Sequence, residues 1–158
     1  MYKIAIVGHG KDKFTNESAR KARELITRIL SRENHPHKGK ICLVSGHSPV
    51  GGIDIWAEEV AKELEIEMDI KSPRQHSWDG EYGYKARNID IASSCDECHI
   101  ILINRLPPNY RGMRFDNCYH CAKHANANIP EHVKSGGCWT GWQAYSRNKD
   151  CTWHIIKQ

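Results

Sequence analysis

The sequence predicts an α/β protein of three layers, with a mainly parallel five-stranded sheet and helices on both faces of the sheet. Short apolar runs typical of buried strands alternate along the chain with longer segments of helical periodicity. Such alternation is typical of parallel strands joined by helices. Three loops rich in glycine lie beside these elements. With 158 residues the chain is long enough for one domain with its own core, residues 1–158.

The first half of the chain is expected to contain three strands and two helices. The strands are residues 3–8, 40–45 and 67–71. Thr15 or Asn16 caps a helix that runs to about Arg32, and a second helix begins near Asp54. Each helix has apolar residues at helical spacing, which we expect to face the core. They are Ala19, Ala22, Ile26 and Ile29 in the first helix and Ile53, Trp56, Val60 and Leu64 in the second.

The second half is expected to contain two strands and two helices around a long irregular segment. A helix covers residues 84–93, and a nearly all-apolar strand covers residues 99–104, as expected for a strand buried on both faces. Residues 105–135 are irregular and rich in Cys and His. The last helix covers residues 138–147 and the last strand residues 152–156. Trp139, Trp142 and Tyr145, spaced by three in that helix, are expected to form a packing stripe.

The glycine-rich loops predict a site for an anion. Residues 8–10 (GHG) and 45–52 (SGHSPVGG) each follow an apolar strand, and residues 135–137 (SGG) precede the last helix. Glycine lets the backbone approach a ligand closely, and the N–H groups of a helix's first turn point toward a bound anion. Ligands of parallel α/β sheets bind at the carboxyl ends of the strands. We therefore expect the three loops to share that edge and to bind a nucleotide or a related phosphorylated molecule.

Composition and charge limit the class of protein. No apolar run approaches the about 20 residues of a membrane helix, and Met1-Tyr2-Lys3 leads directly into a strand, so no signal peptide is expected. These features predict a cytoplasmic protein with no membrane partner. Residues 105–158 hold 8 Lys and Arg against 3 Asp and Glu, which accounts for the net charge of +4. Because no dense basic run occurs, a phosphate pocket and solvated surface explain these cations better than nucleic acid does.

Several motifs, taken in order, resemble the SLOG superfamily of Rossmann-like proteins, which includes the Lonely Guy (LOG) phosphoribohydrolases and the DNA-processing protein A family. Residues 45–54 (SGHSPVGGID) and 83–88 (GYKARN) are similar to a small uncharacterised nucleotide-binding branch. Residues 135–140 (SGGCWT) resemble the second phosphate loop, Pro-Gly-Gly-x-Gly-Thr in LOG enzymes. The resemblance covers most of the chain except about residues 105–130. The residues assigned to the nucleotide are Gly8, His9, Gly10, Ser45, Gly46, Gly51, Gly52, Asp54, Tyr84, Lys85, Arg87, Asn88, Ser135, Gly136, Gly137 and Thr140.

The chain departs from the LOG pattern at two positions. Gln143 stands where LOG enzymes carry their catalytic Glu, and Trp139 stands where they carry a further loop glycine. A Gln side chain does not ionise, so it cannot serve as a charged base or stabilise a developing cation. The resemblance therefore implies nucleotide binding more strongly than hydrolysis, and no catalytic residue is assigned.

Four kinds of side chain near the loops leave alternatives open. Lys85 and Arg87 lie near a helix N-terminus, where cations oppose the helix dipole, so they bind an anion or form a solvated helix end. Asp54 accepts from a ribose hydroxyl, caps the second helix or shapes the glycine loop. His9 binds phosphate, acts as acid or base, or is a neutral loop residue. Trp78 stacks on a base or closes over the core.

The cysteines predict a metal site. Seven cysteines, an odd number without an export signal, favour metal binding or burial over a disulfide framework. Cys118 and Cys121 have the CxxC spacing of a zinc half-site. We expect a structural zinc bound by Cys118, Cys121, His132 and Cys138, with His124 in reserve. Such a site would hold the irregular segment and the loop at residues 135–137 against the start of the last helix.

Two alternatives to this metal site remain. Cys95 and Cys98 also have CxxC spacing, and together with residues 118–121 they fit a zinc ribbon. The intervening strand, about 20 Å long at about 3.3 Å per residue, would separate the two pairs unless the long loop folds back. The other alternative is that no metal binds. Cys42 and Cys151 fall within strands and are expected in the core.

The lead hypothesis is a protein that binds a nucleotide or phosphoribosyl derivative at the carboxyl edge of the sheet, with hydrolysis of a ribosyl or phosphate bond as the reaction to test. The first alternative is a non-enzymatic sensor or sequestering protein for a signalling nucleotide, which Gln143 favours. The second is a single-stranded nucleic-acid binder, supported only by the basic last third of the chain. A homo-oligomer is left open because related folds often dimerise.

Overall fold

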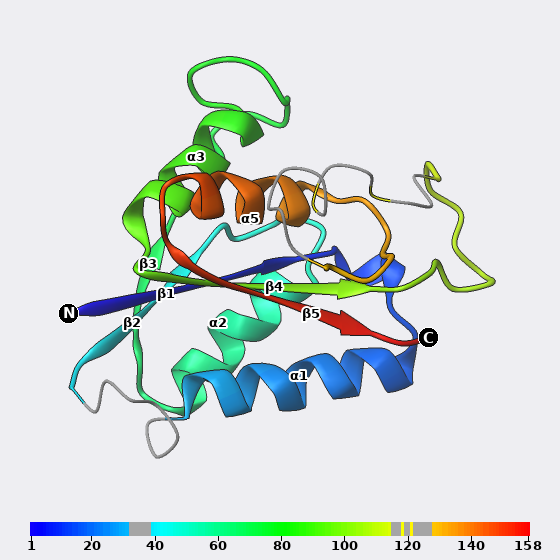
Figure 1. Ribbon diagram of the computed structural model, residues 1–158, viewed down its shortest axis with the longest axis horizontal. Helices are drawn as coiled ribbons and strands as arrows, with labels where there is room; N and C mark the ends of the chain where they lie inside the picture. The colour runs from blue at the N-terminus through cyan, green and yellow to red at the C-terminus, as the bar shows by residue number, and fades with distance from the viewer. Residues whose placement is uncertain (32–38, 115–117, 119–120, 122–127) are drawn as a thin grey trace.

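Five strands form one all-parallel sheet in the order β3-β2-β1-β4-β5 (Figure 1). The computed structural model describes residues 1–31, 39–114, 118, 121 and 128–158. Successive strands extend from β1 to β2 and β3 on one side, and then from β1 to β4 and β5 on the other, so the order reverses at β1. The fold class expected from the sequence is confirmed. The strands are β1 (Tyr2–Gly8), β2 (Ile41–Ser45), β3 (Glu67–Ile70), β4 (Glu97–Ile103) and β5 (Asp150–Ile156).

Helices cover both faces of the sheet (Figure 1). Side chains alternate along β1, so Ile4 and Ile6 pack against the helices of one face, while Ala5 and Val7 pack against those of the other. A short 3₁₀ helix, η1 (Lys11–Lys13), follows β1. In the part of the chain that the structure describes, no helix has the length and apolarity that a membrane crossing requires. The helices are α1 (Asn16–Leu30) and α2 (Ile53–Glu63) on one face and α3 (Tyr84–Ser94) and α5 (Gly136–Ser146) on the other.

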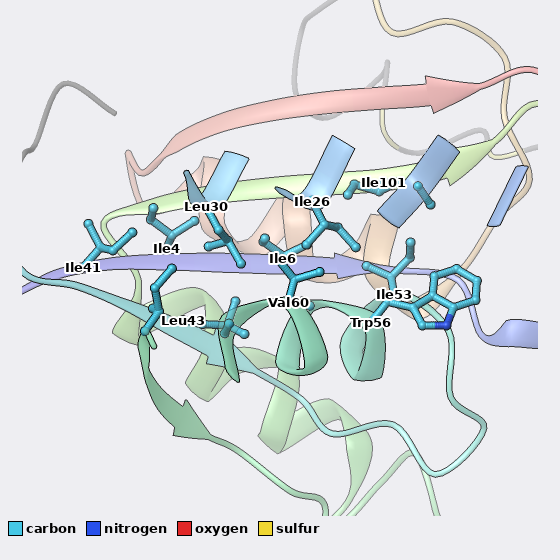
Figure 2. Packing of buried hydrophobic residues seen from close by; sticks show 14 of the residues in the cluster. Ile4, Ile6, Ile26, Leu30, Ile41, Leu43, Ile53, Trp56, Val60 and Ile101 are labelled. Carbon is cyan, nitrogen blue, oxygen red and sulfur yellow. The ribbon is translucent and has the colours of Figure 1, made fainter. Parts of the chain in front are cut away.

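The face covered by α1 and α2 carries a large aliphatic cluster (Figure 2). Thr15 caps α1 in a capping box with Ser18, in which each backbone N–H is bonded by the other residue's hydroxyl. Burial of an aliphatic side chain of this size stabilises a fold by about 1.5–3 kcal/mol. Most of the apolar residues expected to face the core are confirmed. The prediction for Leu64 is wrong, because this residue follows the end of α2 and is 38% exposed. Ala57 and Ala61 complete the buried face of α2 instead.

On the other face, α5 packs against the sheet through small residues. The aromatic residues expected as a packing stripe do not form the buried face of α5: Trp139 and Trp142 are half-buried and Tyr145 is exposed, and Trp139 and Tyr145 pack against the rings of Trp78 and Trp153. The buried residues of α5 are Gly137, Cys138, Thr140, Gly141 and Ala144. A side chain at Gly141 would collide with Ile100 of β4, so the glycine lets the helix lie directly on the sheet. Three elements also begin two residues earlier than expected, namely β4 at Glu97, α5 at Gly136 and β5 at Asp150.

Candidate functional site

A cavity of about 400 Å³ lies at the carboxyl edge of the sheet, beside the point where the strand order reverses. Its walls come from the end of β1, from η1, from the loop between β2 and α2, from the loop before α3, and from the N-terminal parts of α2, α3 and α5. All three glycine-rich loops contribute to it. The assigned nucleotide residues that line this pocket are Gly8, His9, Gly10, Asp54, Tyr84, Arg87, Asn88, Ser135, Gly136, Gly137 and Thr140.

Five assigned residues do not line the pocket. The Lys85 side chain is exposed, outside the pocket. Ser45 is buried and donates its hydroxyl to Glu58, with an O–O distance of 2.6 Å. The remaining three are glycines that shape the loop between β2 and α2. They are Gly46, Gly51 and Gly52.

The loop between β2 and α2 requires glycine at its end. Gly51 and Gly52 have φ angles of 79° and 84°, a region that other residues rarely adopt. A Cβ atom on Gly52 would collide with the backbone at His9 and Gly10. The backbone N–H of Ile53 donates to the His9 carbonyl at 3.1 Å. The end of this loop is therefore fastened to the loop that follows β1.

The first turn of α5 lies directly on the end of β1. A Cβ atom on Gly137 would lie only 2.7 Å from the Cα atom of Gly8. Ser135 caps the helix by accepting the N–H of Cys138 on its hydroxyl at 3.3 Å. The N–H groups of Gly136 and Gly137 have no acceptor among the described residues, as expected for the first turn of a helix. These two N–H groups and the positive end of the helix dipole favour a bound anion at this wall.

Arg87 and Asn88 bring donors to the same pocket. The Nε atom of Arg87 donates to Oδ1 of Asn88 at 2.7 Å, and its Nη1 atom donates to the carbonyl of Gly46. Because Oδ1 accepts from Arg87, the amide NH₂ of Asn88 points the other way. The Asn88 residue is 5% exposed, and its NH₂ has no acceptor in the described part of the chain. The Nδ2 atom lies next to Gly136, 3.7 Å from the position of a Cβ atom there.

Asp54 is a buried carboxylate in the pocket wall. It is 8% exposed, and its Oδ2 atom accepts the backbone N–H of Ser48 at 3.1 Å. Burial raises the pKa of Asp54 to about 6, although Arg87 and Ser48 act to lower it. The N-cap of α2 is Gly52, which makes no side-chain cap. Asp54 therefore shapes the glycine loop, and the helix-capping alternative is not observed.

His9 is a neutral loop histidine. It is 2% exposed, and neither ring nitrogen has a hydrogen-bond partner among the described residues. Burial lowers its pKa well below the usual value, and nearby Lys13 and His132 lower it further. The ring therefore carries no charge with which to attract a phosphate. Its edge-on neighbour is Phe14, with the ring centroids 6.2 Å apart.

Two aromatic residues and one cation complete the pocket. Trp78, 40% exposed, packs edge to face against Trp139 with the centroids 5.0 Å apart. The hydroxyl of Tyr84 lies 2.8 Å from Nδ1 of His76. Lys13 of η1 also lines the pocket and was missed in the sequence. Its position just after the first glycine loop was the available signal. Ser48 and Val50 line the pocket from the loop at residues 45–52, as expected, and the other lining residues that sequence reasoning missed are Val7, Asp12 and Ile91.

A second cluster lies next to the pocket and could hold a metal ion. The candidate ligand atoms of Cys118, Cys121, His132 and Cys138 all lie within 4.8 Å of one another. The sulfur atoms of the CxxC pair are 3.5 Å apart. These four residues are the predicted set; His124 falls outside the described residues. Hydrogen bonds from Cys121 and Cys138 lower the pKa of the Cys118 thiol, which favours the thiolate that a metal requires.

His132 has the orientation of a metal ligand. Its Nδ1 atom lies 2.7 Å from the carbonyl of Pro130 and donates to it, so in the neutral ring Nε2 carries the lone pair. Nε2 is buried and has no hydrogen-bond partner among the described residues. A backbone hydrogen bond that fixes the tautomer of a ligating histidine is typical of metal sites. The residues present therefore fit a tetrahedral ion.

The alternative zinc ribbon is not formed. Cys95 and Cys98 lie at the amino end of β4, whereas the segment that carries His132 is bonded to the carboxyl end of β4, from the N–H of Val133 to the carbonyl of Ile103 at 3.0 Å. Cys98 is in register with Cys151 of β5. The group of close ligand atoms is made by Cys118, Cys121, His132 and Cys138, and neither Cys95 nor Cys98 belongs to it. Of the two cysteines expected in the core, Cys42 is buried and Cys151 is partly buried.

Comparison with known proteins adds no assignment. A scan against protein-family models, a search of curated proteins and a search of solved structures each find no match. What the structure establishes is the Rossmann-like, all-parallel topology and the two neighbouring groups of residues. The resemblance to the SLOG superfamily stays a prediction from motifs.

Proposed function

We propose that the protein binds a nucleotide or a phosphoribosyl derivative in the pocket at the carboxyl edge. One observation carries the proposal: several donors face a single cavity and lack an acceptor among the described residues. They are the N–H groups of Gly136 and Gly137 and the NH₂ of Asn88, with the Arg87 guanidinium beside them. A phosphate supplies the acceptor oxygens and the negative charge that complete such a set.

The pocket walls suggest how such a ligand lies. The phosphate is placed at the first turn of α5, near Asn88. Trp78, which packs against Trp139 of α5, and Tyr84, whose ring centroid lies 5.4 Å from the Arg87 guanidinium carbon, are the aromatic side chains of the wall on which we place the base. Asp54 uses one oxygen for Ser48, which leaves the other to accept from a sugar hydroxyl. A cavity of about 400 Å³ is in the range of pockets that hold a small ligand.

Gln143 favours a sensor or sequestering role over hydrolysis. It does not line the pocket, and its Oε1 atom accepts from Nη1 of Arg147 at 2.7 Å. The residue at the position of the LOG catalytic Glu is therefore hydrogen-bonded near the C-terminal end of α5, outside the pocket. Asp54, with its pKa of about 6, is the group in the pocket wall suited to proton transfer. Incubation with AMP and analysis for free adenine and free phosphate separates the two roles.

We also propose that the ion of the Cys₃His cluster is Zn²⁺ in a structural role. Three thiolates and one imidazole are a common ligand set for structural zinc, and four protein ligands close the tetrahedron. The supporting observations are the mutual distances within 4.8 Å and the orientation of His132. Metal analysis of the purified protein should give one zinc per chain, and Cys121→Ser should lose it while Cys151→Ser retains it.

Calorimetric titration with AMP and ribose 5-phosphate tests the binding proposal. Arg87→Ala should weaken AMP binding at least about tenfold, because a charge-assisted contact is worth about 1.5–3 kcal/mol. Lys85→Ala is the matched control: it removes a cation from the same helix, outside the pocket, and should leave the affinity unchanged. Asn88→Asp keeps the acceptor for Arg87 but places a carboxylate beside the phosphate, so it should weaken binding further. Equal affinities in all four proteins, or no binding at all, would overturn the proposal.

Trp78→Ala tests where the base lies. Stacking of a base on an aromatic side chain contributes about 1–3 kcal/mol. The variant should therefore weaken AMP binding by about fivefold or more and leave ribose 5-phosphate binding unchanged. An equal loss for both ligands would place the base elsewhere.

A further inference from the structure

The first turn of α5 belongs to both groups of residues. Ser135, Gly136 and Gly137 line the pocket, and the next residue, Cys138, is a candidate metal ligand. The hydroxyl of Ser135 accepts the N–H of Cys138 and lies 3.7 Å from its sulfur. The pocket's anion-facing N–H groups and one metal ligand therefore lie in a single helical turn.

The segment that leads into the first turn of α5 is also held by the four candidate metal ligands. His132 and Cys138, two of the four candidate ligands, stand at the two ends of residues 132–138. The backbone carbonyl of His132 accepts the N–H of Cys118 at 2.8 Å. The sulfur of Cys121 in turn lies 3.8 Å from the carbonyl of Cys138. The ligands from residues 118 and 121 thus contact both ends of the segment that carries Gly136 and Gly137.

Little space is left for this turn to move without changing the pocket. Gly137 lies against Gly8 so closely that no side chain fits between them. A bound ion fixes the three sulfurs and the imidazole nitrogen at bonding distances from one centre. Without the ion, no common centre holds these four side-chain atoms at bonding distances, and their relative positions can change. Any displacement of Cys138 moves the N–H groups of Gly136 and Gly137 with it.

We propose that occupancy of the Cys₃His cluster sets the affinity of the pocket for its phosphorylated ligand, through the first turn of α5. The inference rests on the proposed function, since it concerns the regulation of the same pocket. Linkage makes the effect reciprocal: the factor by which the metal strengthens ligand binding is the factor by which the ligand strengthens metal binding. The metal contacts no part of the ligand in this scheme. It acts by holding the donors in place.

Cobalt-substituted protein provides the test. Co²⁺ takes the same ligands as Zn²⁺ and has visible absorption bands that respond to small changes in a tetrahedral site. AMP should shift these bands with a midpoint equal to its calorimetric dissociation constant. Arg87→Ala should move this midpoint to an AMP concentration at least about tenfold higher, whereas Lys85→Ala should behave as the unmodified protein does. The cobalt-substituted protein is folded and fully loaded with metal. The result therefore does not depend on whether the metal-free protein folds.

Chelator competition supplies the reciprocal measurement. Saturating AMP should raise the apparent affinity for Zn²⁺ by about 5- to 50-fold, within the usual range of coupling between sites. If AMP binds but neither the cobalt bands nor the zinc affinity changes, this inference is wrong and the proposed function stands. If AMP and ribose 5-phosphate both fail to bind the zinc-loaded protein, the proposed function itself fails.

Discussion

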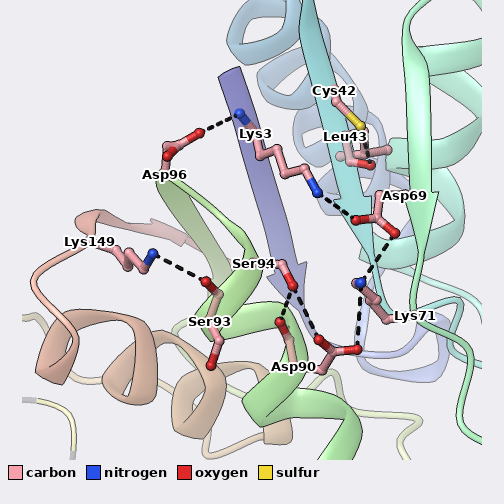
Figure 3. A network of polar contacts seen from close by, with 10 residues as sticks. All are labelled: Lys3, Cys42, Leu43, Asp69, Lys71, Asp90, Ser93, Ser94, Asp96 and Lys149. Atoms are coloured by element: carbon pink, nitrogen blue, oxygen red, sulfur yellow. Dashed lines mark hydrogen bonds and ion pairs between the residues drawn. The ribbon is translucent and has the colours of Figure 1, made fainter. Parts of the chain in front are cut away.

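Two groups of polar residues on the sheet are treated differently. A polar network of Lys3, Asp69, Lys71, Asp90 and Asp96 joins the amino ends of β1 and β4 to β3, to the residue after β3 and to α3 (Figure 3). Every one of these residues has a partner of opposite charge or a hydrogen bond, with N–O distances from 2.8 to 3.6 Å. In the pocket at the carboxyl edge, Asn88 and Gly136 keep donors without an acceptor among the described residues.

This contrast indicates which of the two groups meets a ligand. Partly exposed ion pairs such as those of the polar network each contribute about 0–1 kcal/mol. Gly136 is exposed, so its N–H group is open to water or to a ligand. The network therefore adjusts stability, whereas the pocket leaves its donors available to an outside group.

The largest effect is expected where α5 lies on β1. Gly137→Ala places a Cβ atom 2.7 Å from the Cα atom of Gly8, and backbone cannot move aside as a side chain can. We expect the free energy of unfolding to fall by about 2 kcal/mol, in the range for overpacked sites, and AMP binding to be lost. Urea unfolding and calorimetry measure the two effects.

Gly136→Ala is the matched control for this substitution. The nearest atom to its Cβ would be Nδ2 of Asn88 at 3.7 Å, which is an ordinary contact. Stability should change little, and any effect should fall on ligand affinity. Equal destabilisation by the two substitutions would show that the close contact between α5 and β1 is not the cause.

The next effect concerns Asp54 and pH. Because the pKa of Asp54 is raised from 3.8 to about 6 on folding, its contribution to stability is fully present below about pH 4 and is lost as the pH rises through 6. The loss by pH 7 should be on the order of 2–3 kcal/mol. Asp54→Asn should remove this dependence, so urea unfolding from pH 4 to 8 should give curves for the two proteins that diverge as the pH increases. Parallel curves would show that the carboxyl is not perturbed.

The smallest effect is expected in the polar network. Although burial acts to raise the pKa of Asp69, hydrogen bonds from Lys3 and Lys71 lower it overall. Asp69→Asn should reduce the free energy of unfolding by less than about 1 kcal/mol, and added salt should shrink the difference. AMP affinity should stay the same. A change in AMP affinity here would contradict the separation between the polar network and the pocket.

Local patterns in the sequence were enough to predict the sheet and many of the residues that gather at the pocket and in the cysteine cluster. Alternation of strands and helices fixed the fold class, and CxxC spacing with a later His and Cys identified the four residues that cluster. Packing of whole elements was harder to predict. The aromatic residues of α5 were expected to form its packing stripe, but Gly141 permits a close approach to β4, and the small residues of the helix face the sheet instead.

The difficulty of predicting how a helix is oriented on the sheet also explains why the cations of the pocket were only partly predicted. Lys85 and Arg87 are two residues apart and look equivalent in the sequence, yet only Arg87 lines the pocket. Residues two apart on a helix point in different directions, and the orientation of α3 on the sheet decides which one faces inward. Lys13 reaches the pocket from η1, a short 3₁₀ turn that has no periodic pattern by which to be recognised.

The pairing of β1 has a consequence for how the molecule folds. This central strand has neighbours far along the chain on both sides, since Ile4 is in register with Leu43 and with Glu97. Contacts between distant parts of a chain form slowly, because the intervening loop must close first. The pocket depends on a still longer closure, between Gly8 and Gly137. In a refolding experiment, recovery of AMP binding should therefore trail the recovery of helical signal.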